Sequence, residues 1–412
     1  MIPLREAYHR LDEGLLLAWG RKDRAWETRA LRQCRGRVLA ESIHAVRHEP
    51  PCAVSSMDGY GVSPYFRRHQ GVYGWTLVGE SRAGVPYDVS SPLERGMAVR
   101  LYTGAVVPEG SDRVLLQEDA QEKDGMVTCA HVPPKGAYVR QQGSAMKKGD
   151  MLLTAPLWLQ ARHLLLLASL NRATLSVFKK PRIALLATGD ELAMLGERDV
   201  PSHRVIASTL VGLAASIEAW GGEVVYQGIV RDDRQAFRDV LWDVLLPQVD
   251  MIVTTGGASV GRYDVVARVL EEQDEKEACL FFHKVAIRPG KPVRFAVIAG
   301  CPLLCLPGNP VSSMVCGLLF LRPMIRRWFG LSGDLSGWRS YPLTRALPEE
   351  GTREHYRRGM FVGEGVRAFS SQDSAGLKEF AHADVMIRRQ AGAGPARVGD
   401  MVDGLPLISD EG

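Results

Sequence analysis

The sequence predicts a multidomain α/β and β protein whose centre is a doubly wound, mainly parallel sheet. Three observations support this prediction. The length of 412 residues exceeds that of one compact domain. Between residues 181 and 328, apolar β-rich segments alternate with segments of helical periodicity, which is typical of a parallel sheet covered by helices. On either side of this region, short β-rich segments are separated by glycine and proline turns.

These patterns divide the chain into four parts. We expect a helical and extended linking domain, a small β-rich domain, a central α/β domain and a C-terminal β-barrel-like domain. Their expected bounds are, in that order, 1–45 with 146–180, 46–145, 181–328, and 329–412. The linking domain is therefore predicted to be discontinuous in sequence.

The linking domain is expected to combine helices with extended segments. Apolar residues recur near helical spacing through residues 1–45, so we predict a helical structure there. A second helix is predicted over Leu157–Leu170, and the extended segment Thr174–Phe178 follows it. Pro181 then marks the start of the α/β domain.

Four short segments of the β-rich domain have strand character: Val72–Val78, Ala98–Tyr102, Arg113–Gln117 and Met126–Ala130. The loop before them gathers polar oxygens at Ser55, Ser56 and Asp58, and a solvated turn is the better interpretation of this cluster alone. Farther along, a strand ends at Thr103, where a hydroxyl group lies beside the bare backbone of Gly104.

The α/β domain is predicted from its alternating periodicities. The expected strands are Arg182–Leu186, Glu223–Ile229, Met251–Thr255, Phe281–Ile287, Val293–Ile298 and Leu303–Leu306. The expected helices are Val205–Trp220, Arg234–Leu246, Val265–Gln273 and Val311–Trp328. After them, alternation around Val385–Arg389 and several proline and glycine turns indicate the small C-terminal β domain.

Composition limits the classes of function. A net charge of +4 is small for this length and argues against a nucleic-acid-binding stripe. The N-terminus shows no export signal, and no apolar run is long enough for a membrane span. Seven scattered cysteines then indicate reduced thiols in a cytosol rather than a disulfide framework. Cys301 and Cys305 lack a second Cys or His pair, so we interpret them as core thiols rather than metal ligands.

One strand end has the layout of an anion site. The strand Met251–Thr255 leads into Gly256, Gly257 and Ser259, and a helical pattern begins after Asp264. Glycines leave the backbone N–H groups open to a phosphate, and the helix dipole favours its charge. For a Gly-Gly turn alone, a tight turn without a ligand is an equally good interpretation.

Two further strand ends are polar. Thr188 and Glu191 follow the strand Arg182–Leu186, and Pro307 to Pro310 follow the strand Leu303–Leu306. In the second turn, Asn309 suits a helix N-cap and Pro310 the first helical position, which places Ser312 in the first turn. Ligands of doubly wound sheets bind beyond the carboxyl ends of the strands. Three polar ends of this kind therefore predict a site.

Charged residues suggest what the site handles. Arg288 and Lys291 lie on a proline-stiffened loop, where two cations at fixed separation suit a diphosphate or a molybdate-like oxyanion. A solvated basic loop without a ligand is an equally good interpretation. Carboxylates follow the neighbouring strands at Glu191, Asp232 and Asp264. Acids beside cationic anion-binding groups are what a Mg²⁺-assisted phosphoanhydride reaction requires. Taken singly, each acid is better interpreted as a surface residue or a cap.

The motifs together resemble one family. SSMDGYGV, RLYTGAVVPEGSD, ATGDEL, TTGGASVGRYD, IRPGKP and LPGNPVS occur in the order found in molybdopterin molybdenumtransferases of the MoeA and gephyrin E-domain type. The resemblance covers nearly the whole chain. It implies that the α/β domain binds molybdopterin and that the protein is a cytoplasmic, Mg²⁺-dependent transferase of molybdenum cofactor biosynthesis. The implied reaction inserts molybdenum from molybdate into adenylylated molybdopterin and releases AMP.

The resemblance also implies partners and residue roles. It implies a homodimer whose site combines the α/β domain of one subunit with the β domain of the other. Molybdopterin adenylyltransferase and apo-molybdoenzymes are the implied partners, with no nucleic acid and no membrane. The residues that match catalytic positions are Asp58, Glu191, Asp232 and Asp264, with Glu191 and Asp264 as metal ligands. Those that match ligand-binding positions are Thr103, Thr188, Gly256, Gly257, Ser259, Arg288, Lys291, Pro307, Pro310 and Ser312.

The chain departs from the family pattern at three places. Ala145 stands where an acid is usual, Arg288 where lysine is usual, and Thr209 where asparagine is common. The missing acid motivates an alternative function: a non-catalytic or altered-substrate paralogue, for example for tungstate, that binds the pterin and hands cofactor to apo-enzymes. A third candidate is adenylylation of molybdopterin, because the α/β domain alone resembles that enzyme.

Overall fold

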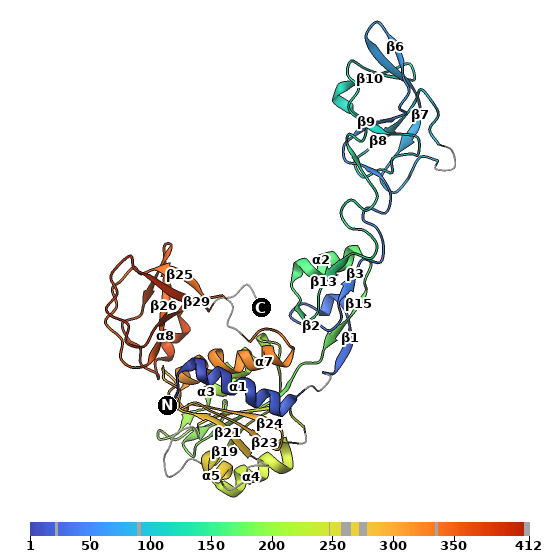
Figure 1. The fold of residues 1–412 in the computed structure, drawn as a ribbon. Helices are drawn as coiled ribbons and strands as arrows, with labels where there is room; N and C mark the ends of the chain where they lie inside the picture. Colours follow the sequence, from blue (N-terminus) through green and yellow to red (C-terminus); the bar gives the residue numbers. More distant parts are fainter. Residues whose placement is uncertain are drawn as a thin grey trace. The chain divides into compact units, whose positions relative to one another are not determined.

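The structure of the protein is a computed structural model. It describes residues 1–20, 24–88, 92–246, 248–256, 265–271, 278–333 and 337–407. The chain folds into two compact units, whose elements are labelled in Figure 1. The main unit comprises Met1–Ala40, Pro156–Leu165 and Ala173–Gly412, and the β unit comprises Glu41–Ala155 and Leu166–Arg172.

The β unit is built on a seven-stranded sheet, with the order β10-β11-β7-β8-β5-β9 and β6 beside β7. Its strands are β5 (Gly59–Val62), β6 (Arg67–His69), β7 (Val72–Ser81), β8 (Met97–Leu101), β9 (Arg113–Leu116), β10 (Ala120–Lys123) and β11 (Met126–Cys129). The four segments predicted as strands all lie in this sheet. Trp75 of β7 is fully buried in its core, where the indole donates to the Ser63 carbonyl.

Smaller elements complete the β unit. They are the pair β3 (Ile43–His44) and β13 (Met151–Leu153), the pair β4 (Val54–Ser55) and β12 (Val139–Arg140), and the short helix η2 (Gln117–Asp119).

A six-stranded sheet with the order β19-β16-β20-β24-β23-β21 forms the core of the main unit. Its strands are β16 (Arg182–Thr188), β19 (Glu223–Val230), β20 (Met251–Thr255), β21 (Ala278–His283), β23 (Arg294–Ile298) and β24 (Cys301–Leu306). β19, β16, β20 and β24 run parallel, whereas β23 and β21 pair antiparallel at one edge. The predicted doubly wound, mainly parallel sheet is therefore confirmed.

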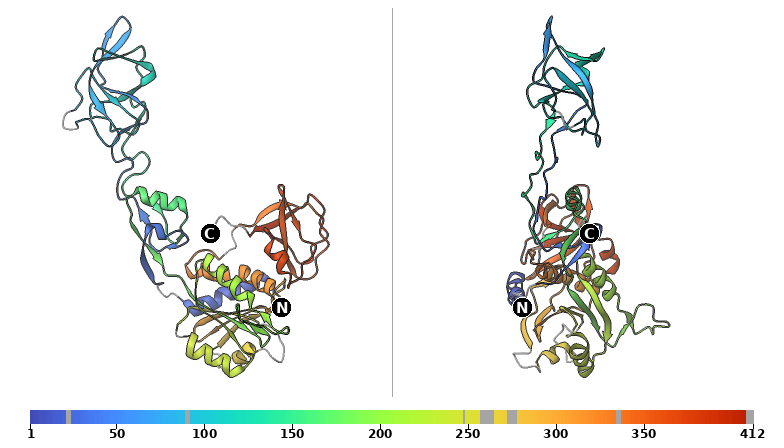
Figure 2. Two further views of the ribbon diagram at one scale, coloured as in Figure 1. Left: turned by 180° about the vertical axis from the view of Figure 1, so that it is seen from behind. Right: turned by 90° about the vertical axis from the view of Figure 1, so that its right-hand side faces the viewer.

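Helices cover both faces of this sheet (Figure 1), and the view from behind in Figure 2 shows the same two layers. Because side chains alternate along a strand, Ile183 and Leu185 of β16 join one hydrophobic cluster, and Ala184 and Leu186 join the other. The first cluster includes α1 (Leu4–Trp19), α3 (Ser208–Ala219) and the helical segment at 310–328. The second includes α4 (Arg234–Asp239), η3 (Val240–Leu245) and α5 (Val265–Glu271).

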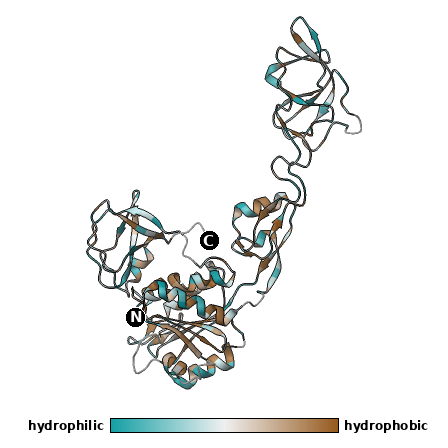
Figure 3. Cartoon of the chain, viewed as in Figure 1, coloured by the Kyte–Doolittle hydropathy of each residue, from teal (hydrophilic) through white to brown (hydrophobic). Residues whose placement is uncertain are grey.

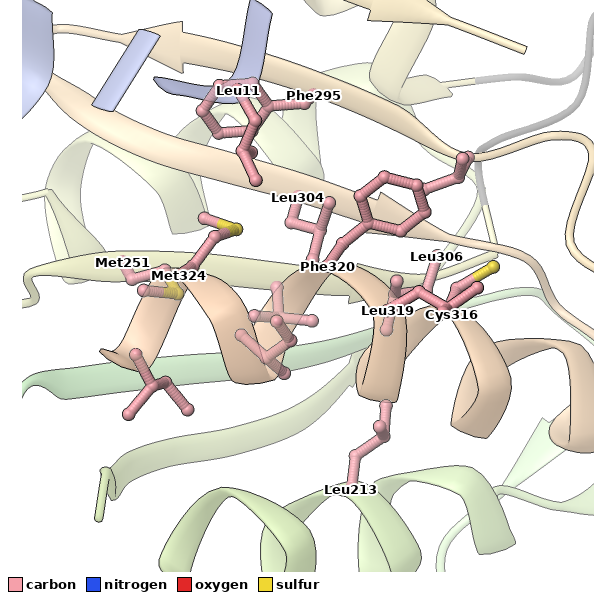
Figure 4. Packing of buried hydrophobic residues seen from close by; sticks show 14 of the residues in the cluster. Leu11, Leu213, Met251, Phe295, Leu304, Leu306, Cys316, Leu319, Phe320 and Met324 are labelled. Atoms are coloured by element: carbon pink, nitrogen blue, oxygen red, sulfur yellow. The ribbon is translucent and has the colours of Figure 1, made fainter. Parts of the chain in front are cut away.

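The central strands are hydrophobic on both faces, as the brown colour of the sheet in Figure 3 shows. The helical segment at 310–328 consists of α6 (Pro310–Cys316), the π-helical η4 (Gly317–Leu321) and α7 (Arg322–Trp328). In Figure 4, Phe320 and Leu319 of this segment lie with Leu304 and Leu306 of β24 in one cluster. Every labelled residue of that view is under 2% exposed, so the start of α6 rests on a closely packed base.

Three predicted helices need correction. Residues 1–45 are α-helical only over α1, whose C-cap residue Gly20 has φ +52°. β1 (Trp26–Ala30), the short 3₁₀ helix η1 (Leu31–Gln33) and β2 (Val38–Leu39) follow. The helix expected at Leu157–Leu170 is α2 (Ala161–Ser169), and the one expected at Val205–Trp220 is α3. The first two residues of that predicted helix instead form β18 (Val205–Ile206), which pairs with β17 (Leu192–Ala193).

Strand pairing explains these differences. β1 pairs with β15 (Thr174–Phe178), and β14 (Leu157–Trp158) pairs with β2, in a four-stranded sheet. In such segments a partner strand distant in sequence decides the secondary structure, because local propensity is weak compared with tertiary pairing.

The C-terminal part of the main unit is a curled sheet with the order β22-β26-β28-β29-β25 and β27 beside β26. Its strands are β22 (Ile287–Arg288), β25 (Arg339–Pro342), β26 (Glu354–Val362), β27 (Gly365–Ala368), β28 (Val385–Arg389) and β29 (Met401–Pro406), with α8 at Leu377–Ala381. A bridge between Leu343 and Val366 brings β27 close to the end of β25, as expected for a barrel-like sheet. Among the described residues, no helix is long and apolar enough to cross a membrane.

Candidate functional site

Three parallel strands end side by side at the carboxyl edge of the central sheet. In the register of the sheet, Ala187 lies opposite Thr255, and Thr255 lies opposite Leu306. The Gly256 N–H extends this order by donating to the Leu306 carbonyl at 3.1 Å. The carboxyl ends of β16, β20 and β24 therefore lie next to one another, as the sequence predicted.

Gly256 can only be glycine in this arrangement. Its φ is +87°, and a Cβ atom there would lie 2.6 Å from the Thr188 carbonyl oxygen and 2.7 Å from the Thr188 Oγ1. The Thr188 hydroxyl is itself buried and has no hydrogen-bond partner among the described residues. A buried hydroxyl without a partner costs about 1–3 kcal/mol, so a ligand that pairs with it would recover that energy.

The proline loop after β24 begins α6 at Pro310, with Asn309 as its N-cap residue, as predicted. The Asn309 side chain donates to the Ser374 Oγ at 3.0 Å instead of capping the helix. The Val311 N–H is also used, because it donates to the Ser374 carbonyl at 3.2 Å. Ser313 donates its hydroxyl to the Pro307 carbonyl, whereas Ser312 is buried and lines a cavity.

The basic loop is fixed from two sides. Its first residues form β22, in which Arg288 lies opposite His355 of β26. Gly290 has φ +105°, and a Cβ atom there would overlap the Sγ of Cys316. The Cys316 thiol donates to the Gly290 carbonyl at 3.6 Å, and burial raises the pKa of this thiol. Arg288 and Lys291 are exposed at the tip of this fixed loop.

These segments enclose a cavity of about 1150 Å³. Seven residues named from the sequence line it: Thr188, Glu191, Arg288, Lys291, Pro307, Pro310 and Ser312. A volume of this size exceeds the range of about 300–1,000 Å³ typical of small-molecule sites. The structure therefore brings together the strand-end turns, the basic loop and the proline loop around one space.

One wall of the cavity was missed by sequence reasoning. It consists of Arg353, just before β26, and residues 372–375, between β27 and α8. Arg358 holds this segment: the residue is 2% exposed, and its Nη1 donates to the Asp373 carbonyl at 2.7 Å. The Arg358 backbone N–H donates to Gln372 Oε1 at 2.9 Å. No motif or periodicity links these residues to the strand ends, because their contact is purely tertiary.

Among the described residues that line the cavity, cations outnumber acids. Arg288, Lys291 and Arg353 are the cations, and Glu191 and Asp373 are the acids. The Glu191 carboxylate lies over Gly189, where a Cβ atom would be 2.5 Å from the Glu191 Oε2. Three flexible cations beside a buried hydroxyl make the cavity suited to an anion that carries several oxygens.

Asp232 lies at a neighbouring hollow rather than at this cavity. The hollow has a volume of about 750 Å³, and Asp190, Asp232 and Asp233 line it. The Asp232 N–H donates to the Asp190 Oδ1 at 3.3 Å, and Asp233 caps α4 by accepting from the Ala236 N–H at 2.8 Å. Leu192 lines both spaces. The expected acids Glu191 and Asp232 are therefore near one another but do not line one cavity.

Gly257, Ser259 and Asp264 lie outside the described residues. Within the described part of the chain, no group of three or more His, Cys, Asp or Glu side chains is arranged to hold a metal ion. Cys301 and Cys305 are buried free thiols in β24, as expected of core residues.

Asp58 and Thr103 meet inside the β unit. The Asp58 Oδ1 accepts the Thr103 N–H at 2.7 Å and the Thr103 hydroxyl at 2.8 Å. These two hydrogen bonds lower the pKa of the Asp58 carboxyl, with a smaller contribution from the Arg100 charge. The pairing of β5 with β8, in which Gly59 lies opposite Leu101, holds the two exposed residues at the same edge. Sequence reasoning named both residues but gave no reason for their contact.

Comparison with known proteins covers almost the whole chain. Residues 2–171 match the family described as "MoeA N-terminal region (domain I and II)". Residues 184–327 match the "Probable molybdopterin binding domain", and residues 340–407 match the "MoeA C-terminal region (domain IV)". These three regions occur in the same order as the motifs along the sequence.

Individual proteins give the same result. The chain is 32% identical over 371 residues to a molybdopterin molybdenumtransferase of Nostoc sp. strain PCC 7120, covering 85% of this chain and 82% of that protein. It is 32% identical over 337 residues to the enzyme of that name from Haemophilus influenzae, covering 80% of each.

The fold is similar to that of a molybdopterin biosynthesis MoeA protein of Pyrococcus horikoshii. The TM-score is 0.82 at 20% identity, over 98% of this chain and 100% of that one. With the identity and coverage of the two relatives above, these matches show that the chain belongs to the molybdopterin molybdenumtransferase family.

Proposed function

We propose that this protein acts in molybdenum cofactor biosynthesis, where it inserts molybdenum from molybdate into adenylylated molybdopterin and releases AMP. One observation carries the proposal. The turns after β16 and β24, the end of β20, a fixed basic loop and a wall from the C-terminal part enclose one cavity, and the described residues that line it include three cations. Both substrates are oxyanions, one of them bulky, which agrees with the charge and the volume of this cavity.

In this proposal the cations bind the substrates. Arg288 offers a planar guanidinium that can donate two parallel hydrogen bonds to a phosphate or to molybdate. Lys291 is a compact charge on the same loop, and the bond between Cys316 and the Gly290 backbone keeps the loop in place. Arg353, just before β26, lines the same space. Together they hold a phosphoanhydride and an incoming oxyanion close to each other, which lowers the entropic part of the barrier.

The glycine turn completes the substrate site. Gly256 brings bare backbone next to the Thr188 hydroxyl, which has no partner among the described residues. We propose that Thr188 donates this hydroxyl to the pterin substrate, and that Gly257 and Ser259 also bind it. Pro307, Pro310 and Ser312 form the opposite wall.

The residues present fit a magnesium ion in part. Mg²⁺ is held in many enzymes by one or two carboxylates together with substrate phosphates and water. Glu191 supplies one carboxylate at the cavity, and Asp264 is the second proposed ligand. Bound there, the ion would offset negative charge on the phosphates. Asp232 remains a proposed catalytic residue that acts from the neighbouring hollow.

We also propose a homodimer, in which the Asp58 and Thr103 pair of one protomer serves the cavity of its partner. Asp58 stays ionised to low pH because Thr103 donates two hydrogen bonds to it. The proposed upstream partner is a molybdopterin adenylyltransferase, and the proposed recipients are apo-molybdoenzymes. We propose that the protein acts in the cytosol, where cysteines are kept reduced, and its seven free cysteines support this location.

The test is a reaction of the purified protein with adenylylated molybdopterin, molybdate and Mg²⁺, in which AMP is measured by chromatography. We expect AMP release by the wild type. The variant Glu191→Gln should release AMP at least about 100-fold more slowly while its pterin affinity changes little, because it removes a carboxylate and no substrate-binding cation.

The variant Lys291→Ala should instead weaken substrate binding, because it removes one of the three cations of the cavity. Lys148→Ala in the β unit is the matched control, and it should behave like the wild type. The proposal is wrong if folded wild type releases no AMP under these conditions. Glu191 leaves the catalytic set if Glu191→Gln turns over at the normal rate.

A further inference from the structure

A second cavity, of about 480 Å³, opens at the other end of the central sheet. Arg182 at the start of β16 and Cys301 at the start of β24 line it, as does Asp250 just before β20. Six residue steps of β16 separate Arg182 from Thr188, which corresponds to about 20 Å of extended chain. The second cavity is therefore distinct from the candidate functional site.

Its lining is strongly cationic. Arg24, Lys179, Lys180 and Arg182 all line the cavity. Among the described lining residues the one acid is Asp250, whose Oδ2 accepts the Arg182 backbone N–H at 2.8 Å. Burial lowers the pKa of Arg24. An anion beside this guanidinium would offset the cost of burying its charge.

The rest of the lining is apolar and rigid. The rings of Trp19 and Trp328 pack edge to face, with centroids 5.2 Å apart. Both indole N–H groups are used, since Trp19 donates to the Asp250 carbonyl and Trp328 to the Lys179 carbonyl, each at 3.3 Å. These bonds fix the rings and leave only their carbon atoms for a ligand. Leu246 and Val249 extend the apolar surface.

We propose that this cavity is a second binding site, for a small phosphorylated compound that carries a flat aromatic ring, such as a mononucleotide. The four cations match a phosphate, and the indole surface matches a ring. An inorganic oxyanion would satisfy the cations but leave the apolar wall in contact with water. The volume of 480 Å³ falls within the range of about 300–1,000 Å³ seen for small organic ligands.

The test uses AMP as the probe and removes binding at the candidate site first. Arg288→Ala/Lys291→Ala is the background variant, and calorimetry measures AMP binding to the full-length chain. We expect this variant to retain one AMP per chain. Adding Lys180→Glu and Arg182→Glu should weaken that binding at least tenfold, because two cations become anions. Adding Lys123→Glu and Lys148→Glu in the β unit is the charge-matched control and should leave the affinity unchanged.

Circular dichroism confirms that each variant folds. If the charge-reversed pair does not fold, Lys180→Gln/Arg182→Gln takes its place, with a smaller expected loss. AMP affinity that is unchanged by both pairs would overturn the proposal. So would displacement of AMP by equimolar inorganic sulfate, because that result would show a site for inorganic anions without a role for the indole wall.

Discussion

At the scale of single residues, close approach of backbone and side chain shapes the candidate site. Gly256 lies against Thr188, Gly189 lies under the Glu191 carboxylate, and Gly290 lies against Cys316. All three glycines have positive φ values, where a Cβ atom is strained. Glycine is therefore required at each position for two reasons: the backbone angle is strained for other residues, and a neighbouring group occupies the place of a Cβ atom.

Gly290→Ala tests this at the basic loop. The added methyl group would overlap the buried Cys316 thiol, so the free energy of unfolding should fall by about 3 kcal/mol, the sum of overpacking and left-handed strain. Lys291 should also lose its fixed position, so molybdate binding should weaken. Thermal unfolding and equilibrium dialysis of molybdate measure the two effects.

Gly363→Ala is the matched control. Gly363 also has a positive φ, +59°, but a Cβ atom there would have no other atom within 4 Å. This variant should lose only about 1 kcal/mol and should bind molybdate normally. Equal losses in the two variants would contradict the role assigned to the contact with Cys316.

At the scale of elements, strand pairing joins the basic loop to the C-terminal sheet. β22 carries Arg288 and pairs with β26, where Arg288 lies opposite His355. His355 is buried, and its Nδ1 lies 2.8 Å from the Glu350 Oε2; Glu350 also accepts from Arg357 Nε at 2.6 Å. Burial lowers the pKa of His355 to about 4, against the opposing effect of Glu350. The imidazole is therefore neutral in the folded protein at pH 7.

This buried histidine predicts acid sensitivity of the C-terminal sheet. The unfolded chain takes up a proton near pH 6.5 and the folded chain only near pH 4, so stability is full above pH 6.5 and falls between pH 6.5 and 4. Burial raises the pKa of Glu350, but hydrogen bonds from Arg357 and His355 lower it below its usual value overall. Protonation of Glu350 therefore removes further folding stability at lower pH. From pH 7 to pH 5 we expect a loss of about 2 kcal/mol.

Hydrogen exchange of β26 and β28, corrected for the intrinsic pH dependence, measures this loss. The variant His355→Gln keeps a donor for Glu350 but cannot gain a proton, so its protection should change little between pH 7 and pH 5. Wild-type protection that stays constant over this interval would contradict the prediction.

At the scale of the whole molecule, the proposed residues come from two compact units. Asp58 and Thr103 belong to the β unit, and Glu191, Arg288 and Lys291 belong to the main unit. The family resemblance implies that the two groups act together across a homodimer. The division into four domains, with a discontinuous linking domain, likewise stays a prediction.

Mixed dimers test the shared site. Asp58→Asn and Glu191→Gln should each abolish AMP release as homodimers. If one protomer serves the cavity of its partner, a mixed dimer has one site with both defects and one intact site. Random reassociation of equal amounts should then restore about a quarter of wild-type activity. Activity that stays at the level of the separate variants would show that both residues serve the same protomer's cavity.

Much of the fold follows from periodicity in the sequence. The central strands alternate with amphipathic helices, and this pattern alone predicted the parallel sheet and the convergence of three turns at its carboxyl edge. It failed where pairing is non-local. Trp26–Ala30, Val38–Leu39 and Leu157–Trp158 form strands because partners from elsewhere in the chain pair with them.

The site divides in the same way. Sequence determined the residue types that suit an oxyanion, because the chemistry of glycine, arginine, lysine and carboxylates is local to each motif. Only the tertiary structure decided which of them share a space: it added Arg353 and residues 372–375 to the cavity and assigned Asp232 to a neighbouring hollow. A cavity wall is made by packing between distant segments, and packing leaves no periodic trace in any one of them.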